Sequence, residues 1–157
     1  PLMMSRFGVR IVDGEIPCVD NAANDHGKPA PFCKVPLKVC GSLCPGKADI
    51  SGKEGSQLIS GLVMALPLAD GNSTIEVTSP KSIPYMFITL DVMKKFGVTV
   101  RNEMTGPREF IESGGDWTYC TDMTFRIKGG QRYKSADMTI EGDWSAAANF
   151  LVAGAVF

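Results

Sequence analysis

Residues 55–69, GSQLISGLVMALPLA, contain the segment that decides the fold. Apolar side chains recur there at the spacing of one helical face, at Leu58, Ile59, Leu62, Val63 and Leu66. Pro67 has no amide hydrogen to donate, so it predicts the end of the helix. The helix opens with a hydroxyl and a carboxamide, on Ser56 and Gln57. Such uncharged groups at a helix N-terminus either cap the helix or help to bind an anion.

The composition indicates a folded domain and argues against nucleic-acid or membrane binding. The 157 residues include 16 Lys and Arg against 17 Asp and Glu, which gives a formal net charge of −1. Because the basic residues are scattered, we expect neither nucleic acid nor an anionic membrane as a partner. The sequence has no apolar run of the length that spans a bilayer. The expected location is the cytoplasm.

The cysteines do not follow a metal-binding pattern. The five are Cys18, Cys33, Cys40, Cys44 and Cys120, and the only histidine is His26. Their spacing lacks the paired C-x-x-C motifs typical of zinc sites. We expect reduced thiols, no metal and no cofactor.

An internal repeat runs through the chain at an offset of about 89 residues. Four blocks recur in the same order: FGVRI (7–11) as FGVTV (96–100), KVCGS (38–42) as RIKGG (126–130), DIS (49–51) as DMT (137–139), and SQLISGLV (56–63) as SAAANFLV (145–152). This conservation of order and offset indicates a duplicated architecture. We assign residues 1–66 to a first, partial unit. Residues 67–157 form a second unit together with the first helix of the next one.

Each unit is expected to follow the order βαβαββ, which predicts an α/β fold with helices on one side of the sheets. Ser82 is positioned to cap a helix that has Pro84 in its first turn and ends near Gly97. Lys94 and Lys95 in its last turn suit the helix dipole. The expected strands are 74–78, 98–102, 108–112, 124–127 and 138–141.

Three segments stand outside this pattern. The polar stretches 18–34 and 104–122 are predicted to be loop insertions at equivalent turns. The apolar run 150–157 is expected to need further protein to pack against. We therefore interpret the chain as a piece of a larger protein.

Five segments together form a family signature. They are Ser56-Gln57, LVMALPLA (62–69), SIPYMFITLDVMKKFGV (82–98), KGGQxY (128–133) and EGDWSAAANFL (141–151). In this order they resemble the enolpyruvyl transferases, and in particular the members that act on shikimate 3-phosphate. The resemblance implies two similar lobes, each an inside-out α/β barrel-like assembly of three βαβαββ units, with the active site in the cleft between them. This chain would supply about two units of one lobe.

The resemblance also implies a reaction and a set of binding residues. The family transfers the carboxyvinyl group of phosphoenolpyruvate to a hydroxyl of shikimate 3-phosphate, in chorismate and aromatic amino acid biosynthesis. The resemblance assigns Ser56 and Ser82 to the phosphate of shikimate 3-phosphate, Gln57 to both substrates, and Tyr85 to the shikimate side. The family's catalytic acid and base groups fall outside this chain, so a second lobe is an expected partner.

Three further residues are weaker candidates. Arg6 lies next to the position at which we align a family arginine that binds phosphoenolpyruvate. Asp143 and Ser145 open the helix that corresponds to the one starting at Ser56, and we expect them to act mainly as caps. The chain also departs from the family pattern at Gly55, where a second serine is common, and at Ile83, where lysine is common.

Two other functions remain open at this point. A lobe of the enolpyruvyl transferase that acts on UDP-N-acetylglucosamine would have the same fold, and a non-catalytic module could keep the fold without the site. Local sequence alone favours simple capping roles for Ser56 and Ser82. The Ser-Gln helix start and the Ser-x-Pro-Tyr motif at 82–85 favour the shikimate 3-phosphate branch.

Overall fold

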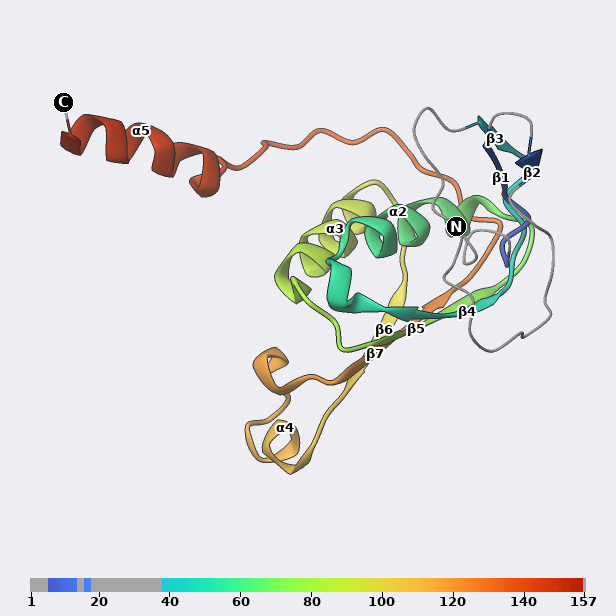
Figure 1. The fold of residues 1–157 in the computed structure, drawn as a ribbon, viewed down its shortest axis with the longest axis horizontal. Helices are drawn as coiled ribbons and strands as arrows, with labels where there is room; N and C mark the ends of the chain where they lie inside the picture. Colours follow the sequence, from blue (N-terminus) through green and yellow to red (C-terminus); the bar gives the residue numbers. More distant parts are fainter. Residues whose placement is uncertain (1–5, 14–15, 18–37, 157) are drawn as a thin grey trace.

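The computed structural model describes residues 6–13, 16–17 and 38–156 (Figure 1). The strands are β1 (Arg10–Asp13), β2 (Ile16–Pro17), β3 (Lys38–Cys40), β4 (Lys47–Ser51), β5 (Ser73–Thr78), β6 (Arg101–Thr105) and β7 (Asp122–Ile127). The helices are α2 (Gln57–Ala65), α3 (Ile83–Lys95), α4 (Arg108–Glu112) and α5 (Trp144–Val156). Short 3-10 turns are η1 (Gly52–Glu54), η2 (Leu66–Leu68) and η3 (Trp117–Tyr119). The predicted α/β class is confirmed.

The main sheet has four strands in the order β4-β5-β7-β6. β4 and β5 are parallel, with Ala48 opposite Ile75, and α2 makes the crossover between them. β7 is antiparallel to both β5 and β6. Along the chain these elements follow the order βαβαββ within one sheet, from Lys47 to Ile127.

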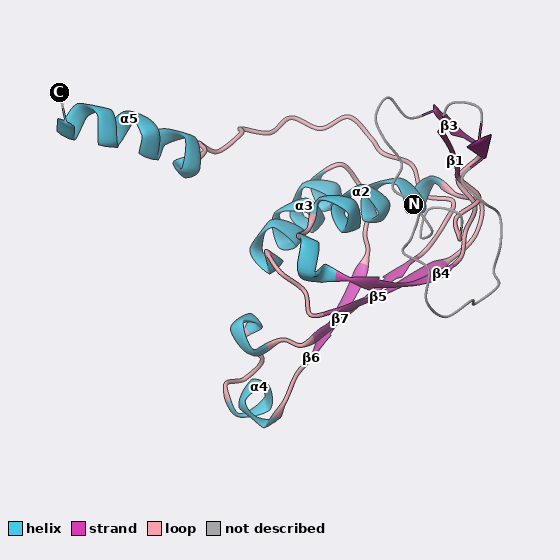
Figure 2. Ribbon diagram, in the orientation of Figure 1, coloured by secondary structure: helices cyan, strands magenta, loops and turns pink. Residues whose placement is uncertain are grey.

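One face of this sheet is buried beneath α2 and α3, which lie side by side over it (Figure 2). The strands bury alternate side chains, as expected for a sheet covered on one face. Ile59, Leu62, Val63 and Leu66 of the opening segment join this core. Leu58 is 46% exposed, so the buried face of α2 is narrower than the sequence predicts. The predicted arrangement of helices on one side of the sheet is confirmed.

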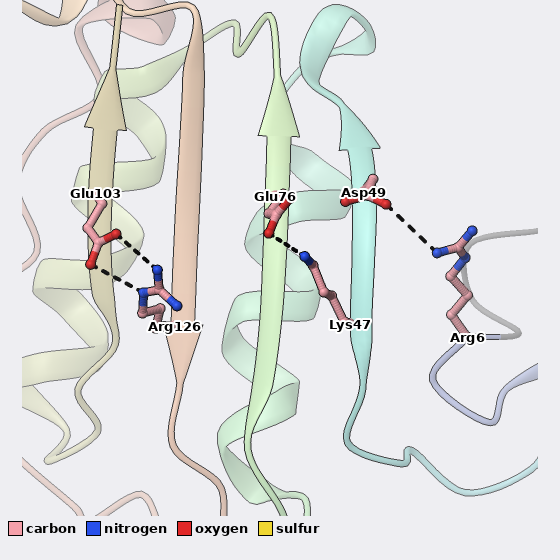
Figure 3. Close-up of polar contacts among 6 residues, drawn as sticks. All are labelled: Arg6, Lys47, Asp49, Glu76, Glu103 and Arg126. Carbon is pink, nitrogen blue, oxygen red and sulfur yellow. Dashed lines mark hydrogen bonds and ion pairs between the residues drawn. The ribbon is translucent and has the colours of Figure 1, made fainter.

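The opposite face of the sheet carries charged side chains, and no helix of the described residues lies over it (Figure 1). Lys47 Nζ lies 2.6 Å from Glu76 Oε1 across β4 and β5. This hydrogen bond and the opposite charge raise the pKa of Lys47 and lower the pKa of Glu76. Across β6 and β7, Arg126 donates from Nε and Nη2 to Glu103 at 3.2 and 3.3 Å. Figure 3 shows these pairs along neighbouring strands.

A second, smaller sheet has the strand order β2-β1-β3, and its strand pairing matches that of the main sheet at the repeated blocks. Val12 faces Lys38 in the β1–β3 pair, and Arg101 faces Arg126 in the β6–β7 pair. In the alignment of the repeat, Val12 corresponds to Arg101 and Lys38 corresponds to Arg126. Both blocks also contain a left-handed glycine, with φ 77° at Gly8 and 82° at Gly97.

The predicted strand 108–112 is wrong, because these residues form the short helix α4. Arg108 Nε donates to Glu112 Oε1 at 2.6 Å, an i to i+4 pair that favours a helical turn. The segment 104–122 is accordingly not a plain loop, since it contains the end of β6, α4 and η3. The strand predicted at 98–102 begins only at Arg101 and extends to Thr105.

The predicted strand 138–141 is also wrong, because these residues lack regular structure. Their counterpart in the repeat is β4, which is held by a ladder of backbone hydrogen bonds to β5. The described residues end with α5 and include no strand that pairs with 138–141 in that way. A lone strand has no partner for its backbone groups and does not persist. The predicted loop 18–34 lies outside the described residues.

Helix α5 extends away from the rest of the chain (Figure 1). None of its 13 residues is buried. Its exposed side chains include Phe150, Leu151 and Val152. The predicted helix is thus confirmed, while its apolar surface lies open.

Candidate functional site

The starts of α2 and α3 lie at the same edge of the main sheet. β4 and β5 run in the same direction, so both carboxyl ends meet that edge, and each leads through a short turn into its helix. The two turns are in direct contact, because a Cβ added to Gly52 would lie 2.6 Å from Pro80 Cα and 3.1 Å from the Ser79 carbonyl oxygen. The topology therefore brings the predicted pairs Ser56-Gln57 and Ser82-Tyr85 to adjoining positions.

Ser56 and Gln57 occupy the N-terminus of α2 in different environments. Ser56 is buried, with 7% exposure, and its side chain makes no cap hydrogen bond. Gln57 is exposed, and its carboxamide folds back over Gly55, where an added Cβ would lie 2.7 Å from Gln57 Oε1. Gly55 has a φ of 109°, a conformation that a serine rarely adopts. Glycine at position 55 therefore fits the backbone of this turn.

Ser82 does not act as the helix cap that its position predicts. Its backbone is left-handed, with φ 58° and ψ 37°, and its side chain makes no cap hydrogen bond. Ser79 is likewise left-handed, with φ 50°. Two such residues in one short turn are uncommon outside glycine, and their strain must be held by the surrounding contacts. Ser82 is exposed, and the side chain of Tyr85 is 58% exposed.

A hydrogen bond between side chains joins α2 to α3 within the first two turns of each helix. Thr89 Oγ1 donates to the Tyr85 carbonyl oxygen at 2.9 Å and contacts Ser60 Oγ at 3.3 Å. A third segment joins the same edge, because the Ser79 amide donates to the Thr121 carbonyl oxygen at 2.7 Å. The excursion between β6 and β7 thus ends beside the turn before α3.

Two lysines at this edge were missed by sequence reasoning. Lys53 lies in the turn before α2 and Lys81 in the turn before α3, and both are exposed. Within the described part of the chain, neither forms an ion pair. The signal available in the sequence was a lysine a few residues before Ser56 and another directly before Ser82.

The three weaker candidates lie elsewhere. Arg6 Nη1 lies 3.9 Å from Asp49 Oδ2, on the polar face of the sheet (Figure 3). Asp143 Oδ1 accepts a hydrogen bond from the Ser145 amide at 2.8 Å, which confirms the predicted capping role of Asp143. Asp143 directly precedes α5 and Ser145 lies in its first turn, and α5 extends away from α2 and α3 (Figure 1).

The described residues also bear on metal sites, reactive cysteines and membrane-spanning helices. Across 6–13, 16–17 and 38–156, no group of three or more His, Cys, Asp or Glu side chains is placed to hold a metal ion. Cys40, Cys44 and Cys120 are free thiols, and burial raises the pKa of Cys120. Among the helices described, none is both long and apolar enough to cross a bilayer.

Adjoining helix starts at the carboxyl edge of a sheet, with free hydroxyl and carboxamide groups, are typical of α/β proteins that bind phosphorylated ligands. Within that class, the family model for EPSP synthase (3-phosphoshikimate 1-carboxyvinyltransferase) matches residues 31–157. The chain belongs to this family.

Individual relatives agree with the family match. The chain is 41% identical over 124 residues to a 3-phosphoshikimate 1-carboxyvinyltransferase of Clostridium kluyveri, covering 78% of this chain and 25% of that protein. It is 39% identical over 115 residues to the same-named protein of Methanococcus maripaludis strain S2, covering 73% and 24%. The chain therefore spans about a quarter of the length of the curated relatives it matches.

Proposed function

We propose that this chain supplies part of the shikimate 3-phosphate site of a 3-phosphoshikimate 1-carboxyvinyltransferase. The observation that supports this most strongly is the contact between the turns before α2 and α3, in a chain of the EPSP synthase family. That contact lets Ser56, Gln57, Ser82 and Tyr85 act on one ligand. The fold alone would not distinguish this function from others.

The proposed ligand suits the groups at this edge. A phosphate ester has close to two negative charges and several acceptor oxygens, so it binds best to donors fixed before it arrives. The hydroxyls of Ser56 and Ser82 are not used as caps and can donate to phosphate oxygens. Each hydrogen bond to a charged group contributes about 1.5–3 kcal/mol. Lys53 and Lys81 add positive potential at the same edge.

In the proposed reaction, the ring hydroxyl of shikimate 3-phosphate adds to phosphoenolpyruvate, and loss of inorganic phosphate then leaves the carboxyvinyl ether. This chain would hold the acceptor in place, with Tyr85 beside the ring and Gln57 donating toward both substrates. Such a fixed donor near developing charge stabilises the transition state. The acid and base groups would come from parts of the protein beyond these residues.

We also propose that the βαβαββ order from Lys47 to Ile127 recurs in a lobe with helices inside and sheets outside. The polar outer face of the main sheet, the covered inner face and the open apolar surface of α5 support this proposal. In such a lobe, the next unit would cover α5. A second lobe would close the cleft, so the 157 residues alone should show little turnover. We further propose that the whole enzyme is cytoplasmic and needs no cofactor.

The test is Gln57→Ala in the full-length enzyme, assayed by phosphate release. We expect kcat/KM to fall at least tenfold, because a fixed donor is lost, or about 1.4 kcal/mol of transition-state stabilisation. Lys95→Ala, an exposed change at the far end of α3, is the matched control and should leave kcat/KM unchanged. Unchanged kinetics in Gln57→Ala, or binding of UDP-N-acetylglucosamine in place of shikimate 3-phosphate, would contradict the proposal.

A further inference from the structure

A surface hollow of about 530 Å³ lies at the opposite edge of the main sheet. It is lined by the start of β5, the start of β6 and the end of β7, including Thr74, Arg101, Arg126 and Lys128. The helix starts that form the proposed substrate site are at the other ends of β4 and β5. The hollow is therefore separate from that site along the length of the strands.

Two of the cationic side chains in this hollow lie opposite each other on neighbouring strands. Arg101 and Arg126 are register partners on β6 and β7, so their side chains leave the same face of the sheet from directly opposite positions. Like charges in such a pair destabilise a sheet unless an anion lies between or beside them. Lys128 follows two residues after Arg126 and adds a third cation to the lining.

Only one of these cations is neutralised within the described residues. Glu103 accepts two hydrogen bonds from Arg126. Across the same described part of the chain, no carboxylate lies within ion-pair distance of Arg101 or Lys128. The hollow thus has an excess of about two positive charges, which matches a ligand with two or more negative charges.

The rim of the hollow is held in place by hydrogen bonds from two side chains to the backbone. Gln131 Oε1 accepts from the Thr99 amide at 2.9 Å, and Gln131 Nε2 donates to the carbonyl oxygens of Thr99 and Lys128 at 3.0 and 2.7 Å. Asn72 Oδ1 accepts from the Gly129 amide at 3.2 Å. Fixing these segments in advance lowers the entropy cost of binding a ligand.

The lining also defines the chemistry of the ligand. Thr74 and Thr99 offer hydroxyls beside the cations, and Ile127 is the one apolar residue of the lining. Because the lining has no aromatic side chain, it offers no surface on which a nucleobase could stack. We propose that this hollow binds a hydrophilic, multiply charged oxyanion of the phosphate class, such as a diphosphate.

The test is calorimetric titration of inorganic pyrophosphate into the full-length protein at constant ionic strength. We expect saturable binding that weakens at least tenfold in Arg101→Gln and several-fold in Lys128→Gln. Arg108→Gln is the matched control, because Arg108 is also an exposed arginine but lies on α4, and it should bind as the wild type does. Circular dichroism checks that each variant is folded.

Ser82→Ala separates this proposal from the proposed function. Pyrophosphate binding that survives Ser82→Ala and is lost in Arg101→Gln supports the hollow as an anion site. Binding lost in Ser82→Ala but kept in Arg101→Gln would place the ligand at the helix starts and overturn the proposal, leaving the proposed function intact. Absence of binding by the wild type, or equal loss in Arg108→Gln, would also overturn it.

Discussion

Helices α2 and α5 occupy corresponding places in the repeat but differ completely in burial. Residues 56–63 align with 145–152, and Leu62-Val63 matches Leu151-Val152. In α2 those two side chains are 3% and 2% exposed, whereas in α5 they are 63% and 64% exposed. Both sequences form a helix here, but the burial of the apolar side chains depends on a sheet beneath the helix. The pairing of β4 with β5 supplies that sheet to α2, whereas α5 lies on no sheet among the described residues.

The largest expected effect is the difference between Leu62→Ala and Leu151→Ala in the 157-residue chain. Leu62→Ala should lower the free energy of unfolding by about 2–5 kcal/mol, because it leaves a cavity in the core. Leu151→Ala should change it by about 0.5 kcal/mol or less, since the side chain is exposed. Urea denaturation measures both.

The same pair of variants in the full-length protein sharpens the comparison. If the next unit covers α5 as we propose, Leu151→Ala should there become about as destabilising as Leu62→Ala. A full-length protein that tolerates Leu151→Ala as well as the short chain does would contradict the proposed repeat.

Substitutions at the first residues of α2 and α5 should also differ in their effect on helix stability, by a smaller amount. Asp143→Ala removes the hydrogen bond to the Ser145 amide and should cost α5 about 0.5–2 kcal/mol of helix stability. Ser56→Ala removes no cap hydrogen bond, so α2 should keep its stability within about 0.5 kcal/mol. Amide hydrogen exchange in the first turn of each helix measures the two effects. Equal changes in both helices would show that Ser56 caps α2 in solution.

The smallest effect concerns the ion pair on the sheet beneath α2. The pKa of Glu76 is lowered by its hydrogen bond to Lys47, so Lys47→Ala should raise it toward its ordinary value. Because the folded-state pKa is the lower one, the contribution of the pair is present above the unfolded-state pKa of Glu76. It is lost as the pH falls through the folded-state pKa. An NMR titration of the Glu76 carboxyl group checks the shift, and an unchanged pKa would mean that the pair does not persist in solution.

The sequence was sufficient where a local signal and the tertiary environment agreed. The apolar spacing and Pro67 located α2, and the Ser-x-Pro-Tyr segment located the start of α3. The alternation in 74–78 located β5, which is central in the sheet and buries alternate side chains. These elements determine which edge of the sheet holds the candidate site.

Prediction from the sequence failed where an element needs a neighbouring strand from elsewhere in the chain, or where a single side-chain contact decides the local structure. Residues 138–141 have the composition of a strand but no neighbour among the described residues to pair with. Residues 108–112 are too few to show a helical period, and one ion pair favours the turn. The left-handed backbone of Ser82 was also not predicted, because a serine before a helix ordinarily has an extended backbone and caps the helix.

The most direct test of the central claim is hydrogen–deuterium exchange of the full-length enzyme with and without saturating shikimate 3-phosphate. If the starts of α2 and α3 bind one ligand together, residues 52–58 and 79–86 should gain protection together at the same ligand concentration. Protection of only one of these segments, or of neither, would contradict the account.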